Sequence, residues 1–495
     1  MAENLPAAPV AIEKLAELEA DELLNQIVDT GVRPREREHG DQLIKNLVEQ
    51  LMDPSFVIAK GVRETIDSRI ASIDLLLSRQ MNAILHHDDF QKLEASWRGV
   101  HKLVDKSETG EHLKLRVLNV SKKDLLRDFQ SAVEYTESAL WKAVYEYEFG
   151  LYGGDPFGAM VGDYEFGKGP QDVSLLQNLS QVAAISHAPF ISAAGPEMFG
   201  MKSLTEMPNP RDIAKIFDKS NPENTKWLSF RDSEDSRFTA LVLPHVLRRL
   251  PYGQDTVEVE AFDYEEDVGG AHEDYLWGNA AYDYAERLTD AFAKYHWCVA
   301  IRGPEGGGLV EDLPIHTFKT REGDVSAKCP TEVVIPDTRE KELSDLGFIG
   351  LLHCKNTDYA AFFGANSAQR PKKYDTKEAT ANAKLSSQIP YLMATSRIAH
   401  YLKAICRDKI GSFMSRANCE TFLNRWLTQY VVLDDDASQE IKAQYPLREA
   451  QVVVEDDKAR PGCYRAVAHL RPHFQLDELN VSLRLVAELP EAAKK

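Results

Sequence analysis

The feature that most constrains the fold is an alternation of strand-like and helix-like segments between residues 111 and 310. Short apolar runs bounded by glycine and proline predict strands, and longer segments with apolar residues every three or four positions predict helices. The predicted strands are Leu113–Val120, Ala159–Tyr164, Phe190–Ala194, Thr239–Leu243 and Trp297–Ile301, and the predicted helices are Leu125–Tyr147, Val173–Ser186, Arg211–Phe217 and Trp277–Tyr295. This order predicts an α/β protein of mixed α+β architecture, with at least partly parallel strands.

The first hundred residues are predicted to be a helical layer. Apolar stripes at helical spacing run through Ile12–Ile27, Ile44–Leu51 and Ile66–Ile84. The first of these helices either packs on its own domain or docks in a groove on a partner, and the residues leave both open. A further helix is predicted to bury the stripe formed by Phe90, Leu93, Trp97, Val100 and Val104, with Glu94 and Arg98 spaced for an ion pair along it.

The end of the chain changes character. Two helices, predicted from about 388 to 409 and around 419 to 430, are followed by the acidic run Asp434–Asp436 and a short polar helix over Ala437–Gln444. Strand-like pieces follow at Ala450–Val454, Tyr464–Leu470 and Val481–Val486. Because two or three isolated strands are marginally stable by themselves, strands from another chain would stabilise them.

The composition argues against several classes of function. The formal net charge of −20 disfavours a general nucleic-acid binder, and no apolar run is long enough for a membrane span. The N-terminus lacks the basic and apolar regions of a signal peptide, and the six cysteines form no Cys-x-x-Cys pair. We therefore expect a reduced cytoplasmic protein with no nucleic-acid partner and no membrane insertion.

No segment carries a recognisable catalytic or cofactor signature. The loop Arg302–Gly308 lacks both the P-loop ending and the dinucleotide pattern, which favours a tight structural turn. His272 and Glu273 have no following histidine at zinc-helix spacing, and His86–Asp89 is typical of a helix cap. His187 lies between apolar stretches, as a core histidine would. We expect a protein that is not an enzyme and that has no cofactor and no metal.

The run Phe90-Gln91-x-Leu93-Glu94-x-x-Trp97-Arg98-Gly99 resembles the signature of the large contractile-sheath subunit of bacterial type VI secretion systems, the TssC/VipB family. Further runs resemble the same family and cover most of the chain. They are Phe149–Gly158, Val161–Phe166, His187–Phe190, Trp227, Phe230–Arg231, Leu243–Pro244, Arg248–Gly253, Trp277–Ala280 and Arg302–Gly308. No single run is specific, but the set is.

The resemblance implies a structural protein with a mechanical function. Such a subunit pairs with a smaller sheath subunit of the TssB/VipA family. The heterodimers stack with further copies of themselves, on a baseplate, into a helical tube around an inner tube of Hcp-family rings. Contraction then drives the inner tube and its spike out of the cell, and the AAA+ ATPase ClpV disassembles the contracted form. A sheath of a related phage-tail-like contractile system and a soluble α/β enzyme with an unrecognised site are the alternatives.

The resemblance also implies roles for parts of the chain. Residues 1–60 would be an N-terminal helical segment with an ATPase-recognition helix at 11–30, residues 61–433 the α/β sheath core, and residues 434–495 an inner-tube-facing helix and inter-subunit strands. The ATPase would bind Ala16, Ala20, Leu23, Leu24 and Ile27. The inner tube would contact Asp434, Asp435, Asp436 and Glu440. The strands that join neighbouring protomers would include Val452, Val454, Val481, Leu483 and Leu485.

Overall fold

The computed structural model describes residues 42, 46 and 62–475, apart from 211, 270–271, 320–324, 411, 413–414, 435, 457–463 and 474. The chain divides into two compact units, residues 1–81 with 259–264 and residues 82–258 with 265–495. The α-helices are α3 (Val62–Leu85), α4 (Asp88–Lys106), α5 (Lys122–Ser131), α6 (Ala139–Trp141), α7 (Pro170–Ser186), α8 (Thr225–Arg231), α9 (Ala281–Tyr295), α10 (Asp337–Asp345), α11 (Lys377–Ser386), α12 (Ile389–Asp408), α13 (Arg416–Thr428) and α14 (Gln439–Gln444). Short 3₁₀-helices and a π-helix, η2 (Lys142–Phe149), lie between them.

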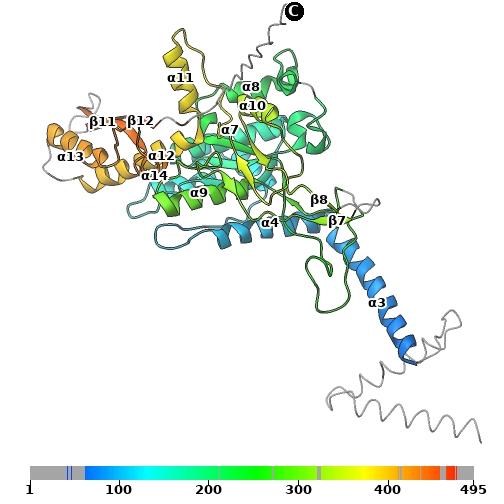
Figure 1. The fold of residues 1–495 in the computed structure, drawn as a ribbon. Helices are drawn as coiled ribbons and strands as arrows, with labels where there is room; N and C mark the ends of the chain where they lie inside the picture. The colour runs from blue at the N-terminus through cyan, green and yellow to red at the C-terminus, as the bar shows by residue number, and fades with distance from the viewer. Residues whose placement is uncertain are drawn as a thin grey trace, which may run out of the picture. The chain divides into compact units, whose positions relative to one another are not determined.

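The second unit is built on a six-stranded sheet in the order β1-β2-β3-β9-β10-β6, which Figure 1 shows between α7 and α9. Its strands are β1 (Met160–Phe166), β2 (Phe190–Ala194), β3 (Thr239–Leu243), β6 (Leu309–Val310), β9 (Phe348–His353) and β10 (Ala360–Phe362). The first four in sheet order are parallel, and β10 and β6 add as an antiparallel edge. Every residue of β2 and β3 is buried, which is typical of strands covered on both faces.

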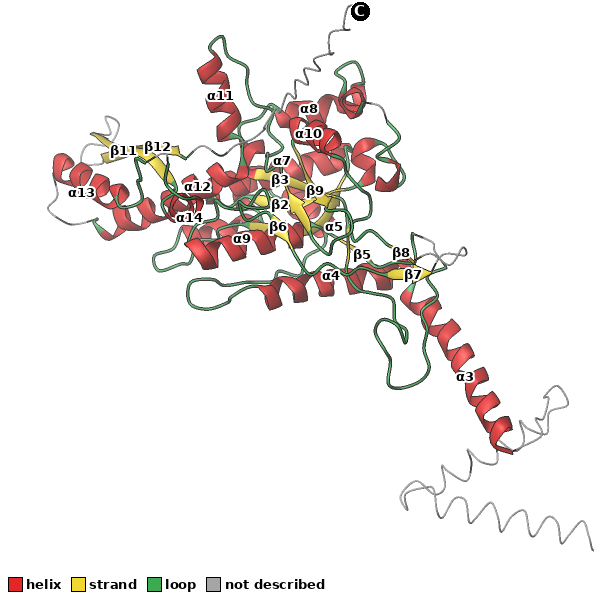
Figure 2. Cartoon of the chain, viewed as in Figure 1, coloured by secondary structure: helices red, strands yellow, loops and turns green. Residues whose placement is uncertain are grey.

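Helices cover this sheet in layers. α7 and α9 both pack against β1, β2 and β3, one on each face (Figure 2). α4 packs in turn on α9 and on β5 (Trp277–Gly278), which pairs antiparallel with β4 (Val246–Leu247). α9 therefore lies between α4 and the sheet.

The C-terminal part has a core of its own. The hairpin of β11 (Leu447–Asp456) and β12 (Tyr464–Pro472) packs against α13. Their buried apolar cluster includes Trp297, Ala394, Leu423, Leu427 and Val452. A further small hairpin pairs β7 (Thr317–Lys319) with β8 (Val325–Ala327).

The predicted strands at 190–194 and 239–243 are confirmed, and β1 lies one or two residues from its prediction. Two predicted strands are wrong. Leu113–Val120 has no neighbouring strand in the described chain. Trp297–Ile301 forms no strand either, and its side chains enter two separate buried clusters, Ile301 in one and Trp297 and Val299 in the other.

The helix predicted over Leu125–Tyr147 is interrupted after Ser131. The Asp128 carboxylate accepts hydrogen bonds from the amides of Ala139 and Leu140, and the Ser138 hydroxyl caps the next turn. The polar side chains therefore start a new helix here. The Arg211–Phe217 helix is shortened to a 3₁₀ turn over Ile213–Phe217.

The contact between α4 and α9 depends on a missing side chain. A Cβ atom at Gly99 would lie 2.4 Å from the Tyr282 ring of α9, closer than packed atoms come. Gly99 therefore lets the two helices approach.

We expect Gly99→Ala to lower the free energy of unfolding by ~1–3 kcal/mol, because the Tyr282 ring must move out of a filled space. Chemical denaturation measures this. Gly110→Ala is the control, since nothing lies within 4 Å of its added Cβ. Equal stability of the two variants would contradict the close packing.

Candidate functional site

Helix α4 turns its apolar stripe outward, which is the reverse of the prediction. Phe90, Leu93, Trp97 and Val104 are exposed, from 36% for Phe90 to 64% for Trp97. Val100, the fifth residue of the predicted stripe, is half-buried against Leu103, Tyr282 and Ala285. The residues buried in α4 are Ala95, Gly99 and Leu103. Helical spacing locates an apolar stripe but does not say which face points inward. Here the close contact at Gly99 and a row of charged residues determine the inward face.

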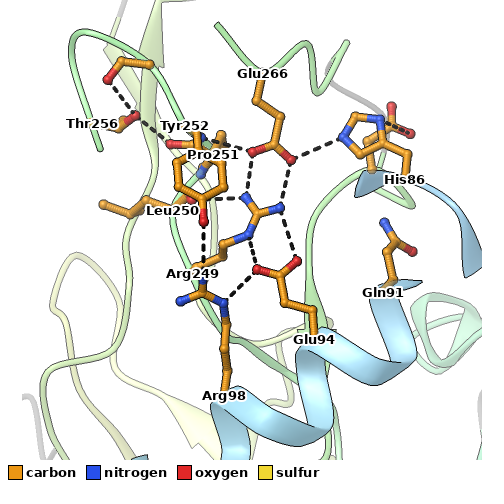
Figure 3. A network of polar contacts seen from close by, with 12 residues as sticks. His86, Gln91, Glu94, Arg98, Arg249, Leu250, Pro251, Tyr252, Thr256 and Glu266 are labelled. Carbon is orange, nitrogen blue, oxygen red and sulfur yellow. Dashed lines mark hydrogen bonds and ion pairs between the residues drawn. The ribbon is translucent and has the colours of Figure 1, made fainter. Parts of the chain in front are cut away.

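The charged row begins with a network around Arg249 (Figure 3). The Arg249 guanidinium donates to Glu94 of α4 (Nε to Oε1, 2.8 Å) and to Glu266 (Nη2 to Oε1, 3.0 Å). Arg98 of α4 also donates to Glu94 (2.7 Å) and to the Tyr252 hydroxyl (3.0 Å). The predicted Glu94–Arg98 pair is thus confirmed, but as one edge of a larger network.

Glu266 has a full set of partners. Besides Arg249, its carboxylate accepts from the Tyr252 amide (2.9 Å) and lies 3.1 Å from His86 Nε2. Burial alone would raise the pKa of the Glu266 carboxyl, but the Arg249 hydrogen bonds and charge outweigh burial and lower its pKa. The side chain is therefore an ionised carboxylate whose role is to hold Arg249.

The preceding residue, Arg248, makes a second network. Its guanidinium donates to both oxygens of Asp283 in α9 (2.9 and 3.2 Å), and Lys102 of α4 donates to the same carboxylate (2.8 Å). Asp283 is completely buried. Burial would raise the pKa of Asp283, but the charges of Arg248 and Lys102 lower it.

The two networks are suited to positioning. Each carboxylate already has cationic partners, and these partners link α4 to α9 and to the segment after β4. The result is a rigidly held helix whose outer face carries large apolar side chains. Such a face is suited to contact with another protein.

The model of the EvpB/VC_A0108 tail sheath N-terminal domain matches residues 67–369, and that of the tail sheath gpW/gp25-like domain matches residues 378–489. The chain belongs to this tail sheath family. Over 495 residues it is 47% identical to the type VI secretion system sheath protein TssC1 of Pseudomonas aeruginosa, covering 99% of this chain and 98% of that protein.

Solved structures of the anti-feeding prophage also align with the sheath subunit. A chain of the anti-feeding prophage baseplate aligns with a TM-score of 0.35 and 10% sequence identity, and the alignment covers 64% of this chain and 66% of the baseplate chain. A chain of the contracted anti-feeding prophage sheath aligns with a TM-score of 0.28 and 12% sequence identity, and the alignment covers 63% of this chain and 66% of the prophage chain.

The residues that the sequence analysis expects to contact partner proteins differ in their exposure, and some of them lie outside the described residues. The recognition helix (Ala16, Ala20, Leu23, Leu24, Ile27), Asp435 and the last strand (Val481, Leu483, Leu485) lie outside the described residues. Asp434, Asp436 and Glu440 are exposed, with Glu440 in the first turn of α14. Val452 and Val454 are buried against α13.

A third ionic cluster lies at the end of the parallel strands. His245 bonds through Nε2 to Glu165 of β1 (3.0 Å) and through Nδ1 to Glu332. Burial would lower the pKa of His245, but its bonds to the two carboxylates outweigh burial and raise the pKa to about 10. Burial would raise the pKa of Glu332, but its contacts with His245 and His272 outweigh burial and lower the pKa to about 2.

The other sequence candidates have structural positions. The Arg302–Gly308 loop turns through Gly303 and Gly307, both at positive φ, and is tied to β10 by backbone hydrogen bonds. His87 caps α4, and His187 ends α7 in the left-handed conformation. Within the described ranges no group of three or more His, Cys, Asp or Glu residues could hold a metal.

None of the helices in the described part of the chain combines the length and the apolar character that crossing a membrane requires.

Sequence reasoning missed the Arg249–Glu266 and Arg248–Asp283 pairs. The available signal was two adjacent arginines directly after a buried apolar run, a place where unpaired charges are rare.

Arg249→Ala should lower the free energy of unfolding by roughly 3–5 kcal/mol, because Glu94 and Glu266 lose the buried cation between them. The control Arg127→Ala removes an exposed pair with Asp124 and should cost at most about 1 kcal/mol. Chemical denaturation compares them. Similar losses in both variants would show that the Arg249 network contributes little.

His245→Gln should destabilise in a pH-dependent way. A raised histidine pKa contributes stability in full below its ordinary value of 6.5 and loses it as pH rises through about 10. The destabilisation, on the order of 2 kcal/mol, should thus be largest near about pH 6 and smaller near about pH 9. Melting curves at several pH values measure it, with exposed His101→Gln as control. A loss that does not change with pH would contradict the charged pairing.

Proposed function

We propose that this sheath subunit pairs with a smaller sheath subunit of the TssB/VipA family and polymerises with copies of itself, on a baseplate, around an Hcp-family inner tube. Contraction of the polymer propels the tube and its spike out of the cell. The subunit acts in the cytoplasm as a structural protein without catalysis of its own, and the ATPase ClpV disassembles the contracted polymer. Family membership and full-length similarity to TssC1 support this proposal.

The observation that carries the proposal is the outward apolar face of α4. A large apolar side chain stabilises by about 1.5–3 kcal/mol when it is buried. Leu93 and Trp97 are exposed in the single chain and do not gain this stabilisation, although Glu94 on the inner side of the same helix is paired with Arg249. A subunit that is buried in a polymer recovers that free energy on assembly, and tryptophan is among the residues that contribute most at interfaces.

The C-terminal hairpin supports strand exchange between protomers, and it favours β12 rather than β11 as the strand to which a neighbour adds. The side chains of Asn424 and Glu420 in α13 bond to the outer backbone edge of β11 at Val452 and Val454. A strand of a neighbouring protomer, contributed by the Val481, Leu483 and Leu485 segment, would therefore add to β12. Val452 and Val454 would support this sheet from inside.

Two further contacts complete the proposal. The exposed carboxylates Asp434, Asp436 and Glu440, with Asp435, would meet cationic groups of the inner tube through weak, solvated pairs that release on contraction. ClpV would bind the amphipathic helix at 11–30 through Ala16, Ala20, Leu23, Leu24 and Ile27, whose apolar stripe supports docking in a groove.

The test is Trp97→Asp in the chain co-expressed with the small sheath subunit. Because Trp97 is 64% exposed, the melting temperature of the variant should stay close to that of the unmodified chain, whereas negative-stain microscopy should show no tubes. Val133→Asp changes a valine that is 90% exposed elsewhere and should leave tubes intact. Normal tubes from Trp97→Asp would remove α4 from the assembly surface, and no tubes even from the unmodified pair would refute the sheath proposal.

A further inference from the structure

A pocket with basic walls lies between helix α12 and the segment 148–156, which begins at the end of η2. Its volume is about 360 Å³, within the range of sites that bind small molecules. Helix α12 contributes Arg397, His400, Lys403 and Arg407 to its lining. Because the whole chain carries a net charge of −20, a concave site with two arginines and a lysine departs from the average charge of the molecule.

Arg407 holds one wall of the pocket in place. Its guanidinium donates to the backbone carbonyls of Phe149 (3.0 Å), Gly150 (3.4 Å) and Leu151 (2.6 Å). These carbonyls are neutral acceptors, so the full positive charge of Arg407 remains at the pocket. The side chain thus ties the segment after η2 to α12 and leaves a cation at the junction.

The other two cations are packed on aromatic rings. The Arg397 guanidinium lies 4.9 Å from the centroid of the Tyr401 ring, and its buried Nε has no hydrogen-bond partner. The Lys403 ammonium lies 3.4 Å from the centroid of the Phe149 ring. Burial lowers the pKa of Lys403, and the nearby charge of Arg407 lowers it further. An anion in the pocket would relieve both effects.

The acidic residues of the lining do not neutralise these cations. The Glu148 carboxylate already accepts from the Arg116 guanidinium and from the Asp155 amide (2.9 Å). Asp408 is exposed to solvent. Among the described residues, no carboxylate forms an ion pair with Arg397 or Lys403. The pocket therefore favours an anionic ligand.

His400 adds a second requirement. The side chain lines the pocket, yet the residue is only 4% exposed. Its Nε2 lies 2.8 Å from the Ser186 carbonyl oxygen, which only accepts, so Nε2 carries the hydrogen. Burial lowers the pKa of His400 to about 4, which keeps the ring neutral near neutral pH. Nδ1 is then a buried acceptor without a partner, so a ligand that also donates a hydrogen bond would remove a cost.

We propose that this pocket binds a small phosphate monoester, with its phosphate oxygens at Arg397 and Lys403 and a hydroxyl group donating to Nδ1 of His400. Phosphate matches the fork of an arginine and the charge of a lysine. A carboxylate or sulfate ion supplies the negative charge but no donor, whereas a hydroxylated phosphate ester supplies both. Tyr152 and Tyr401 line the rest of the pocket and would contact the body of the ligand.

The first test is titration calorimetry of the full chain with glycerol 3-phosphate and, separately, with sulfate. Glycerol 3-phosphate should bind one site per chain and at least ~10-fold more tightly than sulfate, because sulfate has no hydrogen to donate to His400. Equal affinities, or no binding of glycerol 3-phosphate, would overturn the proposal. Binding to vesicles that contain phosphatidic acid, without binding of glycerol 3-phosphate, would identify a lipid headgroup as the ligand and refute the free ester.

Substitutions locate the site. Arg397→Gln and Lys403→Gln should each weaken the binding of glycerol 3-phosphate about 10-fold, because each removes a charge that faces the phosphate. Arg127→Gln is the control, since this arginine lies in an exposed pair with Asp124 and should leave the affinity unchanged. Unchanged affinity in either pocket variant would contradict the assigned site.

Hydrogen–deuterium exchange gives a readout that does not depend on a variant. In the unmodified chain, saturating glycerol 3-phosphate should slow exchange of the amides of residues 150–155, because the ligand would join this segment to α12. Exchange of residues 122–131 in α5 should not change. Binding that leaves the exchange of residues 150–155 unaltered would place the ligand elsewhere and refute the proposal.

Discussion

The structure depends on two adjacent arginines that hold different helices. Arg248 binds Asp283 of α9, and Arg249 binds Glu94 of α4 together with Glu266. Lys102 of α4 closes the link by binding Asp283 as well. Because Asp283 shares Arg248 with Lys102, and Arg249 is shared by Glu94 and Glu266, the set behaves as one unit that fixes α4 against α9.

This arrangement determines which surface the chain presents. An amphipathic helix on its own would place its apolar stripe on the core. In α4 the charged row at Glu94 and Lys102 and the small face at Gly99 fit the inner side, where a side chain at position 99 would meet the Tyr282 ring. The stripe that contains Trp97 is consequently held outward and remains available for a partner. Buried ion pairs often add little net stability, but they can specify orientation, and α4 provides an example of that use.

Sequence patterns predicted what depends on local composition. The buried strands β2 and β3 are short apolar runs between turns, and their limits followed from that alone. The patterns failed where residues far away in the sequence determine which face of an element is buried. The orientation of α4 depends on Tyr282 and Arg249, more than a hundred residues away. Leu113–Val120 alternates as a strand does, yet the described chain supplies no strand beside it. Of the candidate site, the Glu94–Arg98 pair was predictable from helical spacing, whereas Glu266 was not.

The distribution of the cores bears on how such a subunit can take part in two packings. The main sheet and the C-terminal hairpin have separate buried clusters, linked by the continuous helix α12, whose residues enter both. The surface of α4 and the open edge of β12 therefore belong to different cores. Because packed cores resist deformation, a lattice changes by repacking between rigid parts. A change at the hairpin interface thus need not disturb the ion networks that keep Trp97 outward, so one contact can persist while another is exchanged.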